Sequence, residues 1–358
     1  MAAEASLKAW LALSLTRGLG GESARRLLKE FGSPDAVFAA TTSSLSSVVK
    51  TDLAAEIGRG ISEDAIKPAL VWLEDDNNHI VTLADDDYPQ TLLNIPDPPL
   101  LLYVKGRLDL LNRHALAVVG SRSATPQGIN NAEAFSKSLS DTGLCIISGL
   151  AHGIDAAAHR GALRGQGGSI AIVGTGLDIV YPAANRELAH ALAQQGTLVS
   201  EFPLGTPPLA ANFPRRNRLI SGMSVGCLVV EASLQSGSLI TARLALEQGR
   251  DVFAIPGSIH APQSKGCHAL IKQGAKLVET ANDILEELGG AIELPAPASD
   301  PEDSEPMLLG YLGFDPVDVD TLSLRCGLTV AELSAMLLTL ELNGRICVLP
   351  GGLYQRIH

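Results

Sequence analysis

Short apolar runs alternate with helical patterns through the middle of the chain. The runs are Leu116–Val119, Leu144–Ile147, Ile170–Val173, Leu198–Glu201, Val225–Val230 and Val252–Ile255. Runs of this length, without apolar–polar alternation, are typical of strands that are covered on both faces. Helical spacing follows in Asn130–Ser140, Ile154–Leu163, Arg186–Gln194, Leu239–Gln248 and His268–Gln273. The pattern from about residue 112 to 288 therefore predicts an α/β domain, with a parallel sheet and right-handed crossovers.

The first part of the chain predicts a separate helical module. Residues 1–73 show helical spacing on both sides of the turn Gly18-Leu19-Gly20-Gly21. Helix, glycine turn and helix resemble a SAM-like or helix-hairpin-helix module, and a small bundle that only packs on its neighbour explains the pattern equally well. Short extended pieces then follow at Ile80–Leu83 and Leu100–Val104, separated by prolines. They predict a strand extension of the next domain, which we place at residues 74–288.

The last part of the chain predicts a linker and a winged helix. Prolines and acids at residues 289–306 are typical of a linker. Residues 307–358 then predict two helices, Val319–Cys326 and Thr329–Asn343, closed by a β-hairpin. The second helix stands where a recognition helix would, but it carries Glu332 and Glu341 and no basic residue. Because readers of the major groove use basic or amide side chains, we expect this module to contact protein instead.

Composition narrows the class of protein. The chain has 358 residues, 46% of them hydrophobic, which suits a folded protein of two or three domains. A formal net charge of −12 argues against indiscriminate coating of nucleic acid, although screening leaves room for a local basic groove. The five cysteines include no CxxC pair, and Cys145 and Cys227 suit core packing. Without a leader-like start or a membrane-spanning apolar run, we expect a cytoplasmic protein with no membrane partner.

Glycine–serine turns carry the candidate chemistry. They are Gly120-Ser121-Arg122, Ser148-Gly149-Leu150-Ala151-His152-Gly153-Ile154-Asp155, Gly174-Thr175-Gly176 and Ser236-Gly237-Ser238-Leu239-Ile240-Thr241. A turn that follows a strand and opens a helix points N–H groups outward, toward an anion. The fingerprint G-x-G-x-x-G is missing and no acid ends the second strand, so NAD binding is not expected. The guanidinium of Arg122 can instead grip a phosphate in two places.

A basic cluster lies between the third and fourth turns. It consists of Asn212, Phe213, Pro214, Arg215, Arg216, Asn217 and Arg218. Arginines next to turns that can bind phosphate predict that the turns and the cluster form one phosphate-binding groove. In this groove Asn217 can form a hydrogen bond with a base edge or with the nucleic-acid backbone.

Three titratable residues follow the second turn, namely His152, Asp155 and His159. A metal site would need a fourth donor, and a nucleophilic triad would need a serine on a G-x-S-x-G elbow. We therefore interpret Asp155 as a helix cap and the histidines as side chains that pack nearby. No metal ligand and no catalytic residue is expected.

Together the motifs resemble the DNA-processing protein A family (DprA, also called Smf). They include Gly120-Ser121-Arg122, Ser148-Gly149-Leu150-Ala151, Gly153-Ile154-Asp155, Ala158-His159, Tyr181-Pro182, Ser200-Glu201, Phe213-Pro214, Arg216-Asn217-Arg218, Val230-Glu231-Ala232, the turn from Ser236 to Thr241, and Pro256-Gly257. The resemblance implies an extended Rossmann-like fold with a SAM-like module before it and a winged helix after it. It further implies a homodimer that binds single-stranded DNA, uses no cofactor and helps to load the RecA recombinase during natural transformation.

The resemblance also implies a set of DNA-binding residues. They are Gly120, Ser121, Arg122, Ser148, Gly149, Phe213, Arg215, Arg216, Asn217, Arg218, Gly237, Ser238 and Thr241. One departure concerns the dimer surface expected near Gly266–Ile271. Where the family frequently has G-x-N-x-L-I, this chain has His268 at the asparagine position.

An enzyme is the alternative. The sheet and turns also resemble the phosphoribohydrolases that cleave nucleoside monophosphates, whose P-G-G-x-G-T-x-x-E signature ends in a catalytic glutamate. Here Thr241 is followed by alanine and arginine, and the next glutamate is Glu247. Hydrolysis would need a placed general acid or base, so we expect a binding protein that is not an enzyme.

Overall fold

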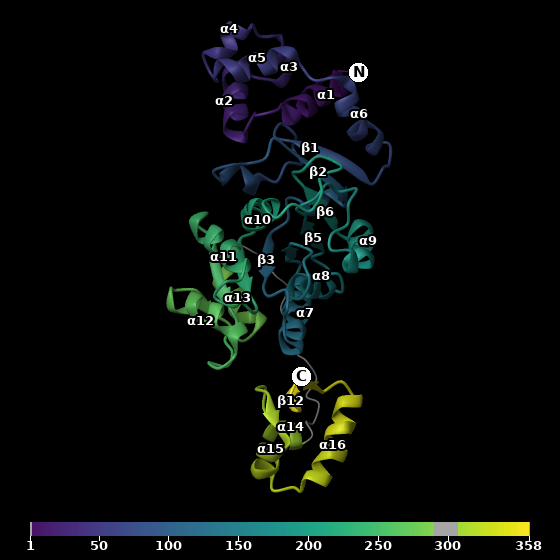
Figure 1. The fold of residues 1–358 in the computed structure, drawn as a ribbon, viewed down its shortest axis with the longest axis vertical. Helices are drawn as coiled ribbons and strands as arrows, with labels where there is room; N and C mark the ends of the chain where they lie inside the picture. Colours follow the sequence, from purple (N-terminus) through teal and green to yellow (C-terminus); the bar gives the residue numbers. More distant parts are fainter. Residues whose placement is uncertain (1, 290–306, 358) are drawn as a thin grey trace.

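A computed structural model describes residues 2–289 and 307–357 of the chain. Figure 1 shows a helical module, a central sheet flanked by helices, and a smaller C-terminal module. The linker predicted at residues 289–306 lies outside the described residues, apart from Gly289. No helix among the described residues is both long and apolar enough to span a bilayer.

The N-terminal module is helical, as predicted. Its helices are α1 (Ala2–Leu15), α2 (Gly21–Phe31), α3 (Pro34–Ala39), α4 (Thr42–Ser46), α5 (Thr51–Arg59) and α6 (Glu63–Trp72). Ser33, Thr41 and Ser62 cap the starts of α3, α4 and α6 with their hydroxyl oxygens. Leu11, Leu27 and Ile57 belong to a core that also contains Leu101 and Tyr103. The module is therefore packed onto the next domain through shared apolar side chains.

The central sheet is mixed. Its strands are β1 (Asn78–Thr82), β2 (Leu101–Gly106), β3 (Ala115–Val119), β4 (Cys145–Ser148), β5 (Ser169–Ile172), β6 (Thr197–Ser200), β7 (Gly226–Val229), β8 (Asp251–Ala254) and β9 (Lys276–Leu277). Their spatial order is β1-β2-β6-β5-β4-β3-β7-β8-β9. The part from β6 to β9 is parallel, as predicted, whereas β2 pairs antiparallel with β6, and β1 with β2. The expected strand extension thus forms one edge of the sheet.

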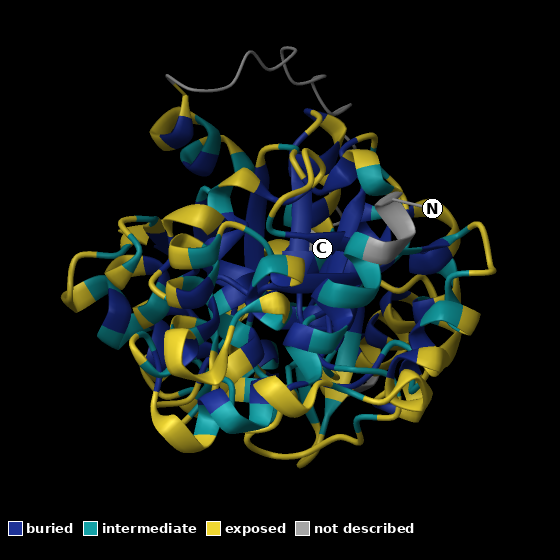
Figure 2. Cartoon of the chain, turned by 90° about the horizontal axis from the view of Figure 1, so that it is seen from above, coloured by how far each residue is buried: buried dark blue, intermediate teal, exposed yellow. Residues whose placement is uncertain are grey.

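Helices cover both faces of this sheet. They are α7 (Pro126–Asp141), α8 (Ile154–Ala162), α9 (Arg186–Gln195), α10 (Asn212–Gly222), α11 (Ser238–Glu247), α12 (Lys265–Lys272) and α13 (Ala281–Leu288). Ala117 packs in one core with residues of α10, α11 and α12, while Leu116 and Val118 pack in another with residues of α7, α8 and α13. Because both faces are covered, the strands need no apolar–polar alternation, and Figure 2 shows them as the buried centre of the molecule.

In the described part of the central domain, the structure adds two helices to the sequence expectation. No element was assigned to the basic cluster, which forms the start of α10, and none to α13. Cys145 and Cys227 are fully buried in β4 and β7, as expected.

The C-terminal module contains the two predicted helices and the closing hairpin, and the structure adds a helix and a short strand before them. Its elements are α14 (Met307–Leu312), β10 (Val317–Asp318), α15 (Val319–Cys326), α16 (Val330–Leu342), β11 (Ile346–Leu349) and β12 (Leu353–Arg356). A capping box between Thr329 and Glu332 starts α16. Leu322, Leu333 and Leu337 form part of its core.

Candidate nucleic-acid interface

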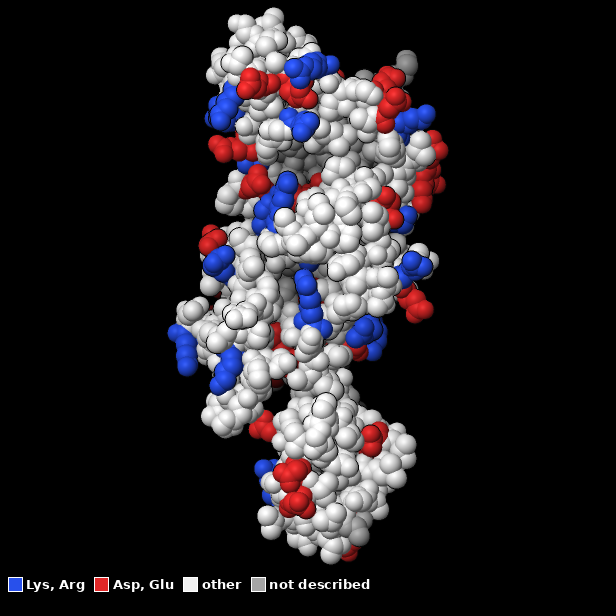
Figure 3. Space-filling model, viewed as in Figure 1, with Lys and Arg blue, Asp and Glu red and all other residues white. Residues whose placement is uncertain are grey.

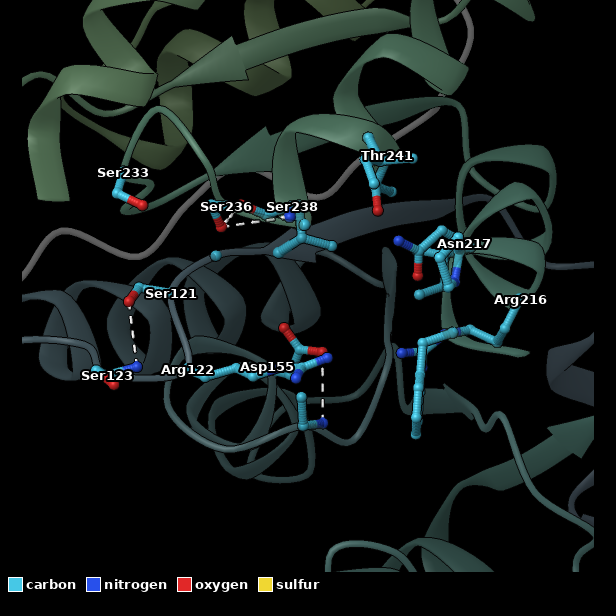
Figure 4. Close-up of a pocket in the computed structure, with 18 of the residues that line it drawn as sticks. Ser121, Arg122, Ser123, Asp155, Arg216, Asn217, Ser233, Ser236, Ser238 and Thr241 are labelled. Atoms are coloured by element: carbon cyan, nitrogen blue, oxygen red, sulfur yellow. Dashed lines mark hydrogen bonds between the residues drawn. The ribbon is translucent and has the colours of Figure 1, made fainter. Parts of the chain in front are cut away.

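A cavity of about 720 Å³ opens beside the carboxyl ends of β3 and β7. These two strands are neighbours in the sheet. The strands that follow β3 in the chain (β4, β5 and β6) lie on one side of this pair, and those that follow β7 (β8 and β9) lie on the other. Such a switch point is where open α/β sheets bind ligands, because the loops diverge there. Most of the residues expected to contact DNA line this cavity: Gly120, Ser121, Arg122, Phe213, Arg216, Asn217, Gly237, Ser238 and Thr241. Figure 4 labels Ser121, Arg122, Arg216, Asn217, Ser238 and Thr241 among them.

The turn after β3 presents Arg122 at this cavity. Gly120 is packed so closely that a Cβ atom there would lie 2.6 Å from Cγ1 of Ile154. The N–H of Ser121 donates to the carbonyl of Glu231 at 2.7 Å, which ties the turn to the loop after β7. Arg122 is exposed and has no ion pair among the described residues; its guanidinium lies 5.8 Å from the ring centre of Phe213. Its positive charge is therefore available to a ligand.

Two aromatic rings line the same cavity. The ring centres of Tyr181 and Phe213 lie 5.6 Å apart at an interplanar angle of 39°, and Tyr181 is 45% exposed. Tyr181 was noted only as part of a motif, and nothing in its spacing marked it as a neighbour of Phe213. A ring pair beside a free arginine offers a surface on which a base can stack.

Arg216 occupies the wall of the cavity and is 4% exposed. Its Nη1 donates to the carbonyl of Gly149 at 2.6 Å and to the carbonyl of Ile172. Burial lowers the pKa of Arg216 to about 10, an effect that the neighbouring Asp155 opposes. The guanidinium is thus still charged at neutral pH. A Cβ atom on Gly149 would lie 2.2 Å from Nη1, so only glycine leaves room for this arginine.

Asp155 faces the same cavity from the first turn of α8. Its Oδ2 accepts hydrogen bonds from the N–H groups of Gly149 at 3.2 Å and Ala151 at 3.4 Å. Burial raises the pKa of Asp155, while nearby Arg216 acts in the opposite direction. The expectation that Asp155 caps its own helix is corrected, because the N-cap position belongs to Gly153 and the carboxylate holds the preceding loop.

The two histidines beside Asp155 behave differently. His159 is fully buried, with Nδ1 at 2.8 Å from Oγ of Ser169, so its interpretation as a packing residue is confirmed. His152 is exposed. No group of His, Cys, Asp and Glu in the described residues is arranged to hold a metal ion.

The start of α11 forms the far side of the cavity. Gly237 is its N-cap residue. The N–H groups of Ser238, Leu239 and Ile240 already donate, to Oγ of Ser236 at 3.4 Å, to the carbonyl of Ser236 at 3.1 Å and to the carbonyl of Gly237 at 3.1 Å. The start of α11 therefore offers a ligand the positive end of the helix dipole and its serine hydroxyls. Oγ of Ser236 lies 2.7 Å from Oγ of Ser238. In Figure 4, Thr241 and Asn217 lie on the side of the cavity that carries Arg216, across from Ser121.

Four expected residues do not line the cavity: Ser148, Gly149, Arg215 and Arg218. Ser148 is buried and donates its hydroxyl to the carbonyl of Val118 at 2.6 Å. Arg218 and Arg215 instead form ion pairs with Glu201, at 2.6 and 3.0 Å. On the face drawn in Figure 3, basic side chains lie along the middle of the central domain and at its edges, while acidic side chains lie mostly near its edges.

Comparison with known protein families shows to which family the chain belongs. Residues 79–289 match the family described as DNA recombination-mediator protein A, and residues 293–352 match the DprA winged helix domain. The chain belongs to this family. The resemblance read from the motifs and the Rossmann-like fold class with its winged helix are therefore confirmed.

Relatives of this family are similar over most of the chain. "Protein Smf" of Escherichia coli K12 is 48% identical over 304 residues, which cover 82% of this chain and 81% of the relative. The crystal structure of DprA from Streptococcus pneumoniae shares 39% identity at a TM-score of 0.68, covering 78% of this chain and 95% of that one. The structure of Helicobacter pylori DprA, described for its single-stranded DNA binding mode, shares 29% identity at a TM-score of 0.54, covering 59% and 96%.

Proposed function

We propose that this protein binds single-stranded DNA in the switch-point cavity and loads a RecA recombinase onto the bound strand in the cytoplasm, during recombination or natural transformation. The observation that carries the proposal is the convergence of Arg122, Arg216 and the N-terminal end of α11 on one cavity. These are positive or partly positive groups from three separate segments, so the cavity suits an extended anion.

Each part of the cavity has a role in this proposal. Arg122, exposed and without an ion pair among the described residues, grips a phosphate. One hydroxyl of the Ser236–Ser238 pair, at the positive end of α11, donates to a phosphate oxygen, and Asn217 reaches a base edge or the sugar-phosphate backbone. Tyr181 and Phe213 stack a base. A base must leave the duplex to reach these rings, so the site favours unpaired strands.

Binding without hydrolysis is favoured over the phosphoribohydrolase alternative. Asp155 is the only carboxylate among the described residues that line the cavity, and its Oδ2 already accepts two backbone N–H groups. The segment after Thr241 continues with Ala242 and Arg243, so it offers no acid where that signature has one. We expect no free base to be released when the protein is incubated with nucleoside monophosphates.

Recombinase loading rests on the family, whose description is that of a recombination mediator. A mediator acts by helping a recombinase to assemble on single-stranded DNA. We expect this protein to shorten the lag of RecA filament assembly on DNA that is precoated with single-strand binding protein. An unchanged lag at saturating protein would refute this part of the proposal.

We also propose that the protein works as a homodimer. Leu234, Ile259 and Leu277 are 65%, 66% and 44% exposed and line one apolar hollow near α12. Soluble monomers rarely expose apolar groups in one patch, and a second copy would bury them. His268, which replaces the family's asparagine, lines this hollow and places Nε2 at 3.0 Å from the carbonyl oxygen of Gly257.

A titration with labelled oligonucleotides tests DNA binding. Matched single- and double-stranded oligonucleotides would be titrated with the full chain by fluorescence anisotropy. We expect the single strand to bind more tightly, with little dependence on base sequence because the cations meet phosphates. Equal affinity for both forms, or no binding at low salt, would contradict the proposed function.

A further inference from the structure

Helix α10 has two functional faces. Phe213, Arg216 and Asn217 point to the cavity, and their spacing of three and four residues puts them on one side of the helix. Arg215 and Arg218 follow the same spacing on the opposite side, where they pair with Glu201. Any tilt or rotation of this one helix therefore moves the cavity wall and the ion pairs together.

Asp97 connects the second face of α10 to the helical module. Its Oδ1 accepts a hydrogen bond from Nη1 of Arg25 at 2.8 Å, and its Oδ2 lies 3.6 Å from Nη2 of Arg218. Arg25 belongs to α2 and Arg218 to α10, so a single carboxylate joins two modules. Arg218 is only 13% exposed, which limits the screening of this pair by solvent.

The segment around Asp97 is built to hold this position. Pro96, Pro98 and Pro99 fix the backbone on both sides, since proline locks one of its dihedral angles. Arg25 also donates to the carbonyls of Pro98 at 2.9 Å and Pro96 at 3.1 Å. A Cβ atom at Gly21, the first residue of α2, would lie 2.5 Å from Oδ1 of Asp97. The carboxylate is thus enclosed by the start of α2.

The other end of α10 rests on the same connecting segment. A Cβ atom on Gly222 would lie 2.8 Å from Cγ2 of Ile95 and 2.9 Å from Cδ2 of Leu92. Ile95 and Leu92 are buried in the core that also contains Leu219 and Ile220. The segment from Leu92 to Asp97 therefore contacts α10 both through apolar packing and through charge.

We propose that Asp97 is a positioning residue for DNA binding, which ties α2 of the helical module to α10 and so sets the orientation of Arg216, Asn217 and Phe213 in the cavity. The inference rests on the proposed function, because its readout is the affinity for single-stranded DNA. It gives the helical module a role in binding that does not need direct contact with DNA.

The direction in which the Asp97→Asn change shifts the affinity for DNA distinguishes a positioning role from a purely electrostatic effect. Asp97→Asn removes a negative charge near a site for a polyanion, so charge alone predicts tighter binding. Arg25→Met removes a positive charge, so charge alone predicts weaker binding. Positioning predicts that both changes weaken binding by about fivefold, and that the double variant is no weaker than either single one.

The experiment is a double-mutant cycle on the full chain. The dissociation constant for an oligothymidine would be measured at one salt concentration for the wild type, Asp97→Asn, Arg25→Met and the double variant, with thermal unfolding recorded for each. Asp86→Asn is the matched control, because Asp86 is an exposed acid of the same region without a hydrogen bond or ion pair among the described residues. Asp97→Glu, which keeps the charge, should recover part of the lost affinity.

The outcomes distinguish this inference from the proposed function. Weaker, non-additive binding by Asp97→Asn and Arg25→Met, with Asp86→Asn at or above wild-type affinity, supports it. Tighter binding by Asp97→Asn, or affinity equal to that of the Asp86→Asn control, overturns the inference and leaves the proposed function standing. A wild-type chain that does not bind single-stranded DNA overturns the proposed function itself.

Discussion

At the scale of single residues, Arg216 joins loops of the site as well as facing the cavity. Its guanidinium reaches the carbonyls of Gly149 and Ile172, which follow or belong to neighbouring strands β4 and β5. Arg122, by contrast, is exposed at the turn after β3. The two arginines therefore share the cavity but differ in what they do: one holds its wall and the other is available to a phosphate.

Replacing Arg216 should destabilise the fold. Arg216→Met leaves two buried carbonyls and the carboxylate of Asp155 without their cation, and we expect the free energy of unfolding to fall by about 3 kcal/mol. Urea denaturation measures this change. Arg215→Met is the control, since Arg215 is 57% exposed and its loss should cost about 1 kcal/mol or less. Equal losses in the two variants would contradict the assigned role.

At the scale of elements, the sequence predicted the strands and their glycine turns well. Unalternated apolar runs have few alternatives to a doubly covered sheet, and turns after such strands must meet at one edge. The helix formed by the basic cluster was not predicted, because the many charged residues obscured the apolar periodicity that would indicate a helix. Once residues 212–222 form α10, Arg216 and Asn217 face the cavity while Arg215 and Arg218 face Glu201. Glu201 directly follows β6, 17 residues before Arg218, and nothing in the sequence pattern marked it as the partner of these arginines.

The packing of α8 against β5 should make stability depend on pH. Oγ of Ser169 donates to the carbonyl of Ile146, so Nδ1 of His159 carries the proton and Nε2 is buried with no partner among the described residues. Burial lowers the pKa of His159 to about 3. The unfolded chain binds this proton near pH 6.5, whereas the folded chain does not until about pH 3. Stability from this residue is therefore full above pH 6.5 and is lost as the pH falls.

The comparison of wild type with His159→Gln isolates this contribution. Between pH 6.5 and 4 we expect the wild type to lose about 3 kcal/mol more unfolding free energy than the variant. Burial raises the pKa of Asp155, which acts with the opposite sign, but that effect is common to both proteins and cancels in the difference. Urea denaturation across this pH range gives the result, and parallel pH profiles would contradict it.

At the scale of the whole molecule, an acidic chain presents a local basic cavity at one edge of its sheet. The net charge of −12 opposes unspecific binding to nucleic acid, while Arg122 and Arg216 act over distances shorter than the screening length of about 8 Å. The apolar hollow lined by Leu234, Ile259 and Leu277 is a separate surface, to which we propose that a second copy of the chain attaches.

A single charge in that hollow should split the proposed homodimer. Ile259→Asp would place a carboxylate among apolar side chains, and we expect light scattering to report half the molar mass of the wild type. Leu93→Asp is the control, because Leu93 is 46% exposed and lies outside the hollow. A wild type that is already monomeric at micromolar concentration, or an unchanged mass for Ile259→Asp, would contradict the proposed dimer.

The salt dependence of binding, compared between the wild type and Arg122→Ala, tests the central claim most directly. If Arg122 neutralises a phosphate, the variant binds single strands of every sequence about tenfold more weakly, and the slope of log K against log salt becomes shallower by about 0.7. Arg164→Ala, which removes an exposed arginine paired with Glu133 on α7, should keep the wild-type slope. Wild-type affinity and slope in Arg122→Ala would show that single-stranded DNA does not bind in this cavity.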